Sequence, residues 1–180
     1  MRILFLAATD FELDAARRAW CGAPACFCVG GWGSEATRQA LDPLLARVPA
    51  FDRVVDVGIA GSYVPQLRIG TAVHVTAEQY GERPGVLLQN PAPLQELAFL
   101  PEATGNTLQE LDDRWRHVTA DVETMEGAAF FEACLSAGIP FAQVRAISNY
   151  VGEADRAHWD IPLALKNLET ALRTLKTKLP

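Results

Sequence analysis

Short apolar runs alternate with amphipathic stretches along most of the chain. The apolar segment Arg2–Ala8 predicts a buried strand, Ala25–Val29 predicts a short second strand, and Val54–Ile59 predicts another apolar strand. Between the first two, Asp10–Trp20 has the composition of a helix with acidic residues in its first turn. This order of elements indicates strands that are connected by helices.

Three glycines interrupt the pattern after the second strand. Gly30, Gly31 and Gly33 predict a tight turn, and Ser34 is expected to cap the helix that follows. The apolar residues of that helix recur at helical spacing: Ala36, Ala40, Leu41, Leu44 and Leu45.

The second half of the chain continues the alternation around one irregular region. Gly81–Pro101 has no clean period and is rich in proline and glycine, so it predicts a loop. Strands are expected at Thr71–Ala77 and Phe141–Ser148, and helices at Glu110–His117, Met125–Ala137 and Pro162–Lys178. The inner side of the last helix is expected to carry Leu163, Leu165, Leu168, Leu172 and Leu175.

Strands that alternate with helices favour an α/β fold, a three-layer α/β/α sandwich with a mixed, mostly parallel central sheet. The chain has no internal repeat, low-complexity segment or convincing linker. Its 180 residues, 49% of them hydrophobic and 21% charged, therefore predict a single domain over residues 1–180.

The net charge and the first residues of the chain argue against nucleic acid as a partner and against a membrane segment. A net charge of −6 and a pI near 5.1 disfavour nucleic acid. The apolar run near the start is short, lacks a cleavage pattern and leads directly into Asp10, Glu12 and Asp14. A buried strand, no membrane segment and a cytoplasmic location are the expectations.

The four cysteines suggest no function. Cys21, Cys26 and Cys28 lack a paired CxxC or nearby histidine spacing, and Cys134 is remote in sequence. Free thiols and no metal site are therefore predicted. The Cys26 and Cys28 pair could still oxidise or bind a metal adventitiously.

The segment DVETMEGAAFF, residues 121–131, has two carboxylates and a methionine where an extended segment meets a small-residue helix. In a helical first turn Glu123 and Glu126 would share a face near the helix N-terminus. Ordinary helix capping explains such acidic residues equally well, so the segment alone leaves both interpretations open.

Three segments together resemble the superfamily of purine nucleoside phosphorylases and methylthioadenosine nucleosidases. The first is 121–131, which is similar to the VEMEA-type signature; the others are VVDVGIAGSY, residues 54–63, and VRAISNYVG, residues 144–152. The resemblance implies that Glu126 holds the ribose hydroxyls and that Met125 lies against the sugar, with Glu123 beside them. It also implies that Ile59, Ala60 and Gly61 form a turn under the sugar.

The resemblance implies catalytic roles for two further residues. Glu12, after the first strand, matches the general base that activates the attacking water, although an isolated glutamate on an amphipathic helix is more often a solvated carboxylate. Arg145 matches a residue that helps to hold this water. Because Arg145 lies in an apolar strand, an ion pair with a partner such as Glu12 or Glu126 is also expected.

Asn149 stands where adenine-releasing nucleosidases carry an aspartate that donates to the purine N7. An amide NH₂ suits a 6-oxopurine, whose O6 and N7 are both acceptors, so hypoxanthine is favoured over adenine. An asparagine that simply ends a strand is the alternative. Asp56 stands where phosphorylases place a phosphate-binding arginine, so water is favoured over phosphate as the nucleophile.

Two weaker resemblances concern the base. Trp159 matches an aromatic residue that closes over the ligand, and core packing is an equally weighted alternative. Asn106 and Thr107, in ATGNTL, are similar to a segment that contacts the base.

Within the superfamily, DVETMEGAAFF, ISNYVG and WDIPLAL are most similar to the futalosine hydrolases. The implied reaction is hydrolysis of a purine nucleoside, futalosine, to dehypoxanthine futalosine and hypoxanthine in menaquinone biosynthesis, without a cofactor and in a homodimer or higher homo-oligomer. The chain is short for that group around residues 80–104. The carboxyphenyl group of the substrate would need a cation, for which Arg38, Arg68, Arg156 or a partner subunit are candidates.

Two other functions stay open. An adenine-releasing nucleosidase, acting on methylthioadenosine, adenosylhomocysteine or aminodeoxyfutalosine, is the nearest enzyme. A purine-nucleoside-binding module that has lost turnover is the second, and the joint presence of Glu12, Glu126 and Arg145 argues against it.

Overall fold

The computed structural model describes residues 1–46, 51–81, 86–109, 119–153 and 155–179. Its strands are β1 (Ile3–Ala7), β2 (Cys26–Val29), β3 (Arg53–Ser62), β4 (Ala72–Tyr80), β5 (Leu87–Gln89), β6 (Glu102–Thr107), β7 (Val122–Thr124) and β8 (Phe141–Tyr150). Its helices are α1 (Asp10–Ala19), α2 (Gly33–Leu45), α3 (Gly127–Ala137) and α4 (Ile161–Lys178), with short 3₁₀ turns η1 (Gln95–Leu97) and η3 (Arg156–His158). The helix predicted at Glu110–His117 lies outside the described residues.

The sheet is mixed, and part of it closes on itself. Strand β1 pairs in parallel with β2 and β3, and β3 pairs in parallel with β8. Strand β3 also pairs with β7, which leads through β6 and β4 back to β8. Among the described residues, β3, β7, β6, β4 and β8 therefore form a closed circuit, while β2, β1 and β5 extend from it.

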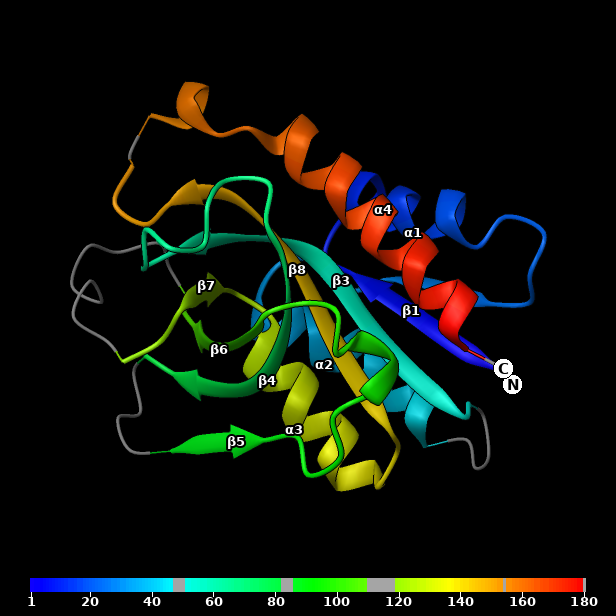
Figure 1. The fold of residues 1–180 in the computed structure, drawn as a ribbon. Coiled ribbons are helices and arrows are strands. Elements are labelled where there is room, and N and C mark those ends of the chain that lie inside the picture. Colours follow the sequence, from blue (N-terminus) through cyan, green and yellow to red (C-terminus); the bar gives the residue numbers. More distant parts are fainter. Residues whose placement is uncertain (47–50, 82–85, 110–118, 154, 180) are drawn as a thin grey trace.

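Helices cover both faces of this sheet (Figure 1). One apolar cluster joins α1 and α4 to the sheet through Leu13, Phe5 and Leu168. A second cluster joins α2 and α3 to the opposite face, where Phe130 and Phe131 pack edge-on against Phe141. The predicted alternation of strands and helices is thus confirmed as a mixed α/β fold.

Several details of the sequence prediction are wrong. Gly81–Pro101 contains strand β5 and turn η1, and the polar segment Glu102–Thr107 is strand β6. Ser34 does not cap α2, because Trp32 is the cap residue and the Ser34 hydroxyl donates to the Met125 carbonyl at 3.4 Å. Leu163 is 37% exposed and does not lie on the inner side of α4.

Two expectations about the chain concern membranes and thiols. Among the described residues, no helix combines the length and apolar character that a bilayer span requires. Cys21, Cys26, Cys28 and Cys134 are all free thiols.

The buried histidine of β4 should make stability depend on pH. His74 is 2% exposed, its Nε2 has no hydrogen-bond partner within the described ranges, and burial lowers its pKa from 6.5 to about 4. As pH falls from 6.5 to 4, the unfolded imidazole takes a proton that the folded one does not. The free energy of unfolding should therefore lose up to about 3 kcal/mol from this group.

His74→Leu should remove that loss. Urea unfolding gives the free energy of unfolding of each protein at pH 7 and at pH 4.5. The fall between the two pH values should be smaller in His74→Leu than in wild type. His158→Leu, at an exposed histidine that faces Glu153, is the matched control and should keep the wild-type dependence. An unchanged acid response in His74→Leu would contradict the assignment to His74.

Candidate active site

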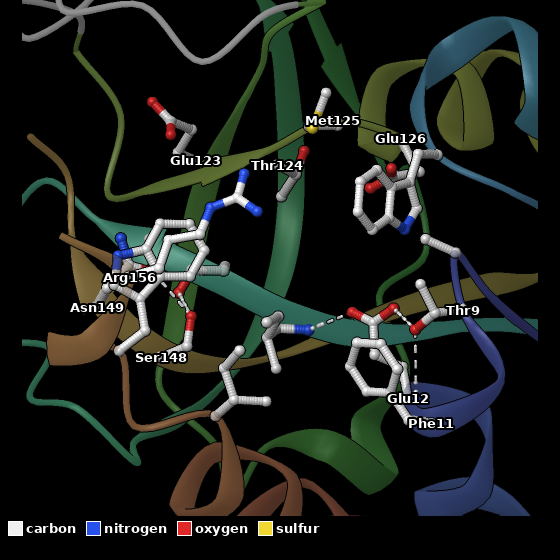
Figure 2. Close-up of a pocket in the computed structure, with 17 residues that line it drawn as sticks. Thr9, Phe11, Glu12, Glu123, Thr124, Met125, Glu126, Ser148, Asn149 and Arg156 are labelled. Atoms are coloured by element: carbon white, nitrogen blue, oxygen red, sulfur yellow. Dashed lines mark hydrogen bonds between the residues drawn. The ribbon is translucent and has the colours of Figure 1, made fainter. Parts of the chain in front are cut away.

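A cavity of about 340 Å³ opens at the ends of β3, β7 and β8 and at the start of α1. Nine of the predicted site residues line it (Figure 2): Glu12, Ile59, Ala60, Gly61, Glu123, Met125, Glu126, Asn149 and Trp159. Residues from four separated parts of the sequence thus meet in one place. Within the described ranges, no group of three histidine, cysteine, aspartate or glutamate side chains could hold a metal ion.

Glu12 is fixed by the start of its own helix. The Thr9 hydroxyl caps α1 by accepting from the Glu12 backbone N–H at 3.5 Å, and it donates to Glu12 Oε2 at 2.5 Å. Glu12 Oε1 accepts from the backbone N–H of Ile59 at 3.0 Å. A carboxylate that is only 6% exposed is therefore held at the floor of the cavity by two donors.

Arg145 lies beneath this floor rather than in it. It is 3% exposed, does not line the cavity, and forms an ion pair with Asp56 on the neighbouring strand. The predicted direct pair with Glu12 or Glu126 is thus wrong. The pairing of the strands explains the choice of partner. Because β3 and β8 are neighbours in parallel, Asp56 on β3 lies next to the guanidinium of Arg145 on β8.

Arg145 nevertheless reaches towards Glu12 across Gly58. A Cβ atom at Gly58 would lie 2.6 Å from Arg145 Nη1 and 2.8 Å from Glu12 Oε1, so only glycine leaves room for both groups. Burial raises the pKa of Asp56 to about 7, and the guanidinium of Arg145 opposes that rise. Asp56 pairs with Arg145 and is absent from the cavity lining, so it does not stand where the sequence suggested, next to the nucleophile.

The acidic segment does not form one helical turn. Glu123 belongs to β7, where its Oε2 accepts from the Tyr63 hydroxyl at 2.9 Å, whereas Glu126 is the cap residue of α3. Glu126 makes no capping hydrogen bond with its own helix. Its Oε1 accepts instead from the backbone N–H of Gly33, the first residue of α2, at 2.9 Å.

The Glu126 carboxyl therefore stands at the cavity between two helix N-termini. Burial raises its pKa, and the charge of Arg145 opposes the rise. The positive φ of Gly31 and Gly33, 81° and 84°, allows the turn that delivers the Gly33 N–H.

Asn149 is oriented by a bulge in β8. The register with β3 shifts between Ala60 and Gly61, which leaves Ser148 as the extra residue and sets Asn149 opposite Gly61. The Ser148 hydroxyl donates to Asn149 Oδ1 at 2.8 Å, and Asn149 Nδ2 donates to the Tyr150 carbonyl at 3.1 Å. Since one N–H of the amide is used by Tyr150, the other is left for a ligand.

Asn106 and Thr107 do not line the cavity, contrary to the prediction. Asn106 is fully buried and donates to the Tyr63 hydroxyl at 3.0 Å. Thr107 is buried as well and donates to Glu78 at 3.0 Å. Both side chains therefore bond to neighbouring protein groups and do not reach the cavity.

Sequence similarity points to one superfamily. A family model described as the phosphorylase superfamily matches residues 97–178. The futalosine hydrolase of Thermus thermophilus is 34% identical over 121 residues, which are 67% of this chain and 43% of that protein. The futalosine hydrolase of Streptomyces coelicolor is 30% identical over 153 residues, 69% of this chain and 65% of that protein.

The chain belongs to the phosphorylase superfamily. It covers less than two thirds of the length of either futalosine hydrolase. A 5'-methylthioadenosine/S-adenosylhomocysteine nucleosidase of Shewanella baltica is 24% identical over 164 residues, 73% of this chain and 70% of that protein.

Solved structures of the superfamily share the fold. The futalosine hydrolase of Helicobacter pylori superposes with a TM-score of 0.84 at 14% identity, covering 99% of this chain and 98% of that one. A methylthioadenosine/adenosylhomocysteine nucleosidase of Colwellia psychrerythraea, in complex with adenine, gives a TM-score of 0.85 at 17% identity and covers 99% and 96%.

Some lining residues of this superfamily member were not predicted. Thr9 and Glu12 follow the T-x-x-E capping pattern, which would have drawn attention to Thr9. Arg156, which the sequence offered only as one of several candidate cations for the carboxyphenyl group, also lines the cavity, 5.5 Å from the Trp159 ring centroid. No local sequence pattern indicated the others, which are Ala8, Phe11, Trp32, Thr124, Ser148 and Ile161.

Proposed function

We propose that the protein is a futalosine hydrolase, which cleaves the N-glycosidic bond of futalosine with water to give dehypoxanthine futalosine and hypoxanthine. The observation that carries the proposal is the arrangement of Glu12 and Asn149 in one cavity (Figure 2). Glu12 binds the Ile59 N–H and Asn149 pairs with Gly61, so roughly 7 Å of strand β3 separates the two groups. A nucleoside can lie along this stretch, with its sugar near Glu12 and its base near Asn149.

In this proposal Glu12 is the general base for the attacking water. Its carboxylate is buried, receives two hydrogen bonds and lies near the fixed charge of Arg145, which would orient water next to it. Glu126 and Met125 would hold the ribose, and the negative charges of the lining carboxylates would stabilise the cationic sugar of the transition state.

The charges of the cavity favour water over phosphate as the nucleophile. Glu12, Glu123 and Glu126 line it together with a single cationic residue, Arg156, among the described residues. This excess of carboxylates would repel a phosphate dianion. Asp56 is not among these lining carboxylates, because it forms an ion pair with Arg145.

Arg156 is the proposed partner for the carboxylate of futalosine. It lines the cavity beside Trp159, which offers an aromatic face for the phenyl ring. Arg38 is engaged by Glu132 and Tyr80, and Arg68 does not line the cavity.

Asn149→Asp should shift the preferred base from hypoxanthine towards adenine. A protonated aspartate can donate to N7, as the amide does, but at neutral pH its charged form repels the O6 of a 6-oxopurine. We expect the ratio of kcat/KM for futalosine to that for aminodeoxyfutalosine to fall by about tenfold or more. Ser148→Ala serves as the control, because it frees the amide without adding charge; an unchanged ratio in Asn149→Asp would contradict the base-binding role.

The decisive experiment is product analysis. Purified protein is incubated with futalosine, aminodeoxyfutalosine, methylthioadenosine and inosine, with and without phosphate, and the released base is identified by chromatography. Hypoxanthine from futalosine, independent of phosphate, is expected. Adenine release would instead support a methylthioadenosine-type nucleosidase, a candidate that the greater coverage of the Shewanella baltica relative favours.

We also propose the wider architecture that the sequence suggested. The packing of α1 with α4 and of α2 with α3 on opposite faces supports a three-layer α/β/α sandwich in a single domain. A homo-oligomer is supported by Phe11 and Trp32 at the cavity, which are 46% and 65% exposed. The cytoplasmic location stays a prediction.

A further inference from the structure

Strand β4 carries a carboxyl group that the proposed reaction does not use. Glu78 is fully buried, and it lies outside the cavity lining. Its Oε1 accepts from Gln143 Nε2 at 3.0 Å and from the Thr124 hydroxyl at 3.2 Å. Its Oε2 accepts from the Thr107 hydroxyl at 3.0 Å. All three donors are neutral, and among the described residues no cation is hydrogen-bonded to Glu78. Burial of such a carboxyl group costs free energy, which suggests that it has a role.

The backbone around Glu78 is shaped to admit its carboxyl group. A Cβ atom at Gly105 in β6, or at Gly127 at the start of α3, would overlap Glu78 Oε1. Both glycines have ordinary negative-φ or extended backbone, so space rather than backbone freedom explains them. Gly127 thus brings the first residue of α3 directly against this carboxyl.

Two of the donors connect Glu78 to the cavity. Thr124 lines the cavity and immediately precedes Met125. Thr107 accepts from the backbone N–H of Ala128, in the first turn of α3, at 2.7 Å. The carboxyl is therefore tied to the chain on both sides of Met125 and Glu126. Figure 1 shows β4, β6 and β7 as neighbours above α3, which is the arrangement this contact requires.

We propose that Glu78 is a positioning residue, whose carboxyl group holds the junction between β7 and α3 so that Met125 and Glu126 face the ligand. Replacement of Glu78 should then alter how the folded protein binds its nucleoside. A merely structural residue would lower only the fraction of folded protein. The kinetic part of the inference rests on the proposed function.

The test compares Glu78→Ala with Glu78→Gln and with a matched control. Glu78→Ala removes the carboxyl group that accepts from both threonines and Gln143, so KM for futalosine should rise by about tenfold or more, with a smaller fall in kcat. Glu78→Gln should recover most of this loss, because its carbonyl can accept from Gln143 and Thr124 while its NH₂ donates to the Thr107 hydroxyl. A KM in Glu78→Ala equal to that of wild type would overturn the proposal.

Asn90→Ala is the control for general destabilisation. Asn90 is also buried and donates to the Phe141 carbonyl at 2.9 Å, away from the cavity lining. Its replacement should lower the melting temperature without changing KM. A rise in KM equal to that of Glu78→Ala would show that loss of stability alone explains the effect, and the proposal would fall.

Amide hydrogen exchange makes the test independent of the reaction. The backbone segment 122–130 should exchange faster in Glu78→Ala than in wild type, with Glu78→Gln and Asn90→Ala close to wild type. If wild-type protein releases no base from any nucleoside, the proposed function fails and this measurement alone decides. Unchanged exchange in Glu78→Ala would then refute the positioning role.

Discussion

Glu12→Gln should lower kcat for futalosine by about 10³-fold while nucleoside binding is largely retained. The amide keeps an oxygen that can accept from the Ile59 N–H, and it has the size of the carboxyl that Thr9 contacts. What it loses is the capacity to take a proton from water. Steady-state kinetics gives kcat, and calorimetric titration with futalosine gives the dissociation constant of the inactive variant.

Asp10→Asn provides the matched control for that experiment. Asp10 lies on the same first turn of α1, but its carboxylate is exposed and faces Arg17. The same change of carboxylate to amide should therefore leave kcat unaltered. Near-normal turnover in Glu12→Gln would exclude Glu12 as the base and would direct attention to Glu126, which lines the same cavity.

Arg145→Met should reduce the free energy of unfolding by about 3–5 kcal/mol at pH 8. Arg145 and Asp56 are 3% and 1% exposed, so removal of the guanidinium leaves a buried carboxylate without its cation. Burial already raises the pKa of Asp56 to about 7 beside Arg145, and loss of Arg145 would raise it further. At pH 5 the carboxyl binds a proton, so the loss of stability should be smaller there than at pH 8.

Two further variants test whether the unpaired charge is the cause. Asp56→Asn combined with Arg145→Met should recover much of the stability, because the side chain at position 56 then carries no charge that lacks its cation. Arg17→Met, at an exposed arginine that pairs with Asp10 and Asp14, should change the urea midpoint little. A double variant as unstable as Arg145→Met would show that lost packing, rather than the charge on Asp56, dominates.

The sequence predicted the strands that are rich in apolar and β-branched residues. Strand β1 is buried at every position and β8 at all but its last, and five of the first seven residues of β8 are apolar. Strand β6 was missed because Glu102–Thr107 has the sequence EATGNT. Four of its residues are buried, and two of the four, Asn106 and Thr107, are polar. Burial there depends on hydrogen bonds to Tyr63 and Glu78, which are distant in sequence and leave no local period.

In the candidate site, too, the features that short sequence segments carry were predicted, and the contacts that depend on strand pairing were not. Glu12, Met125 and Asn149 could be located because family resemblance marks short segments, and all three line the cavity. The partner of Arg145 could not be predicted from the sequence, because it depends on which strand lies beside β8 and on the register of that pairing. The helical first turn predicted for Glu123 and Glu126 failed because β7 pairs with β6 and extends the chain as far as Thr124.

The closed strand circuit constrains the order in which the molecule can fold. Strand β8 follows all the other strands among the described residues, yet it bonds to both β3 and β4 and carries Asn149. During synthesis, chain that has emerged only to residue 140 has two hydrophobic strands with open edges, which is a situation that invites pairing with other chains. Association of nascent chains should therefore be greatest just before residues 141–150 emerge, and the cavity can form only after they do.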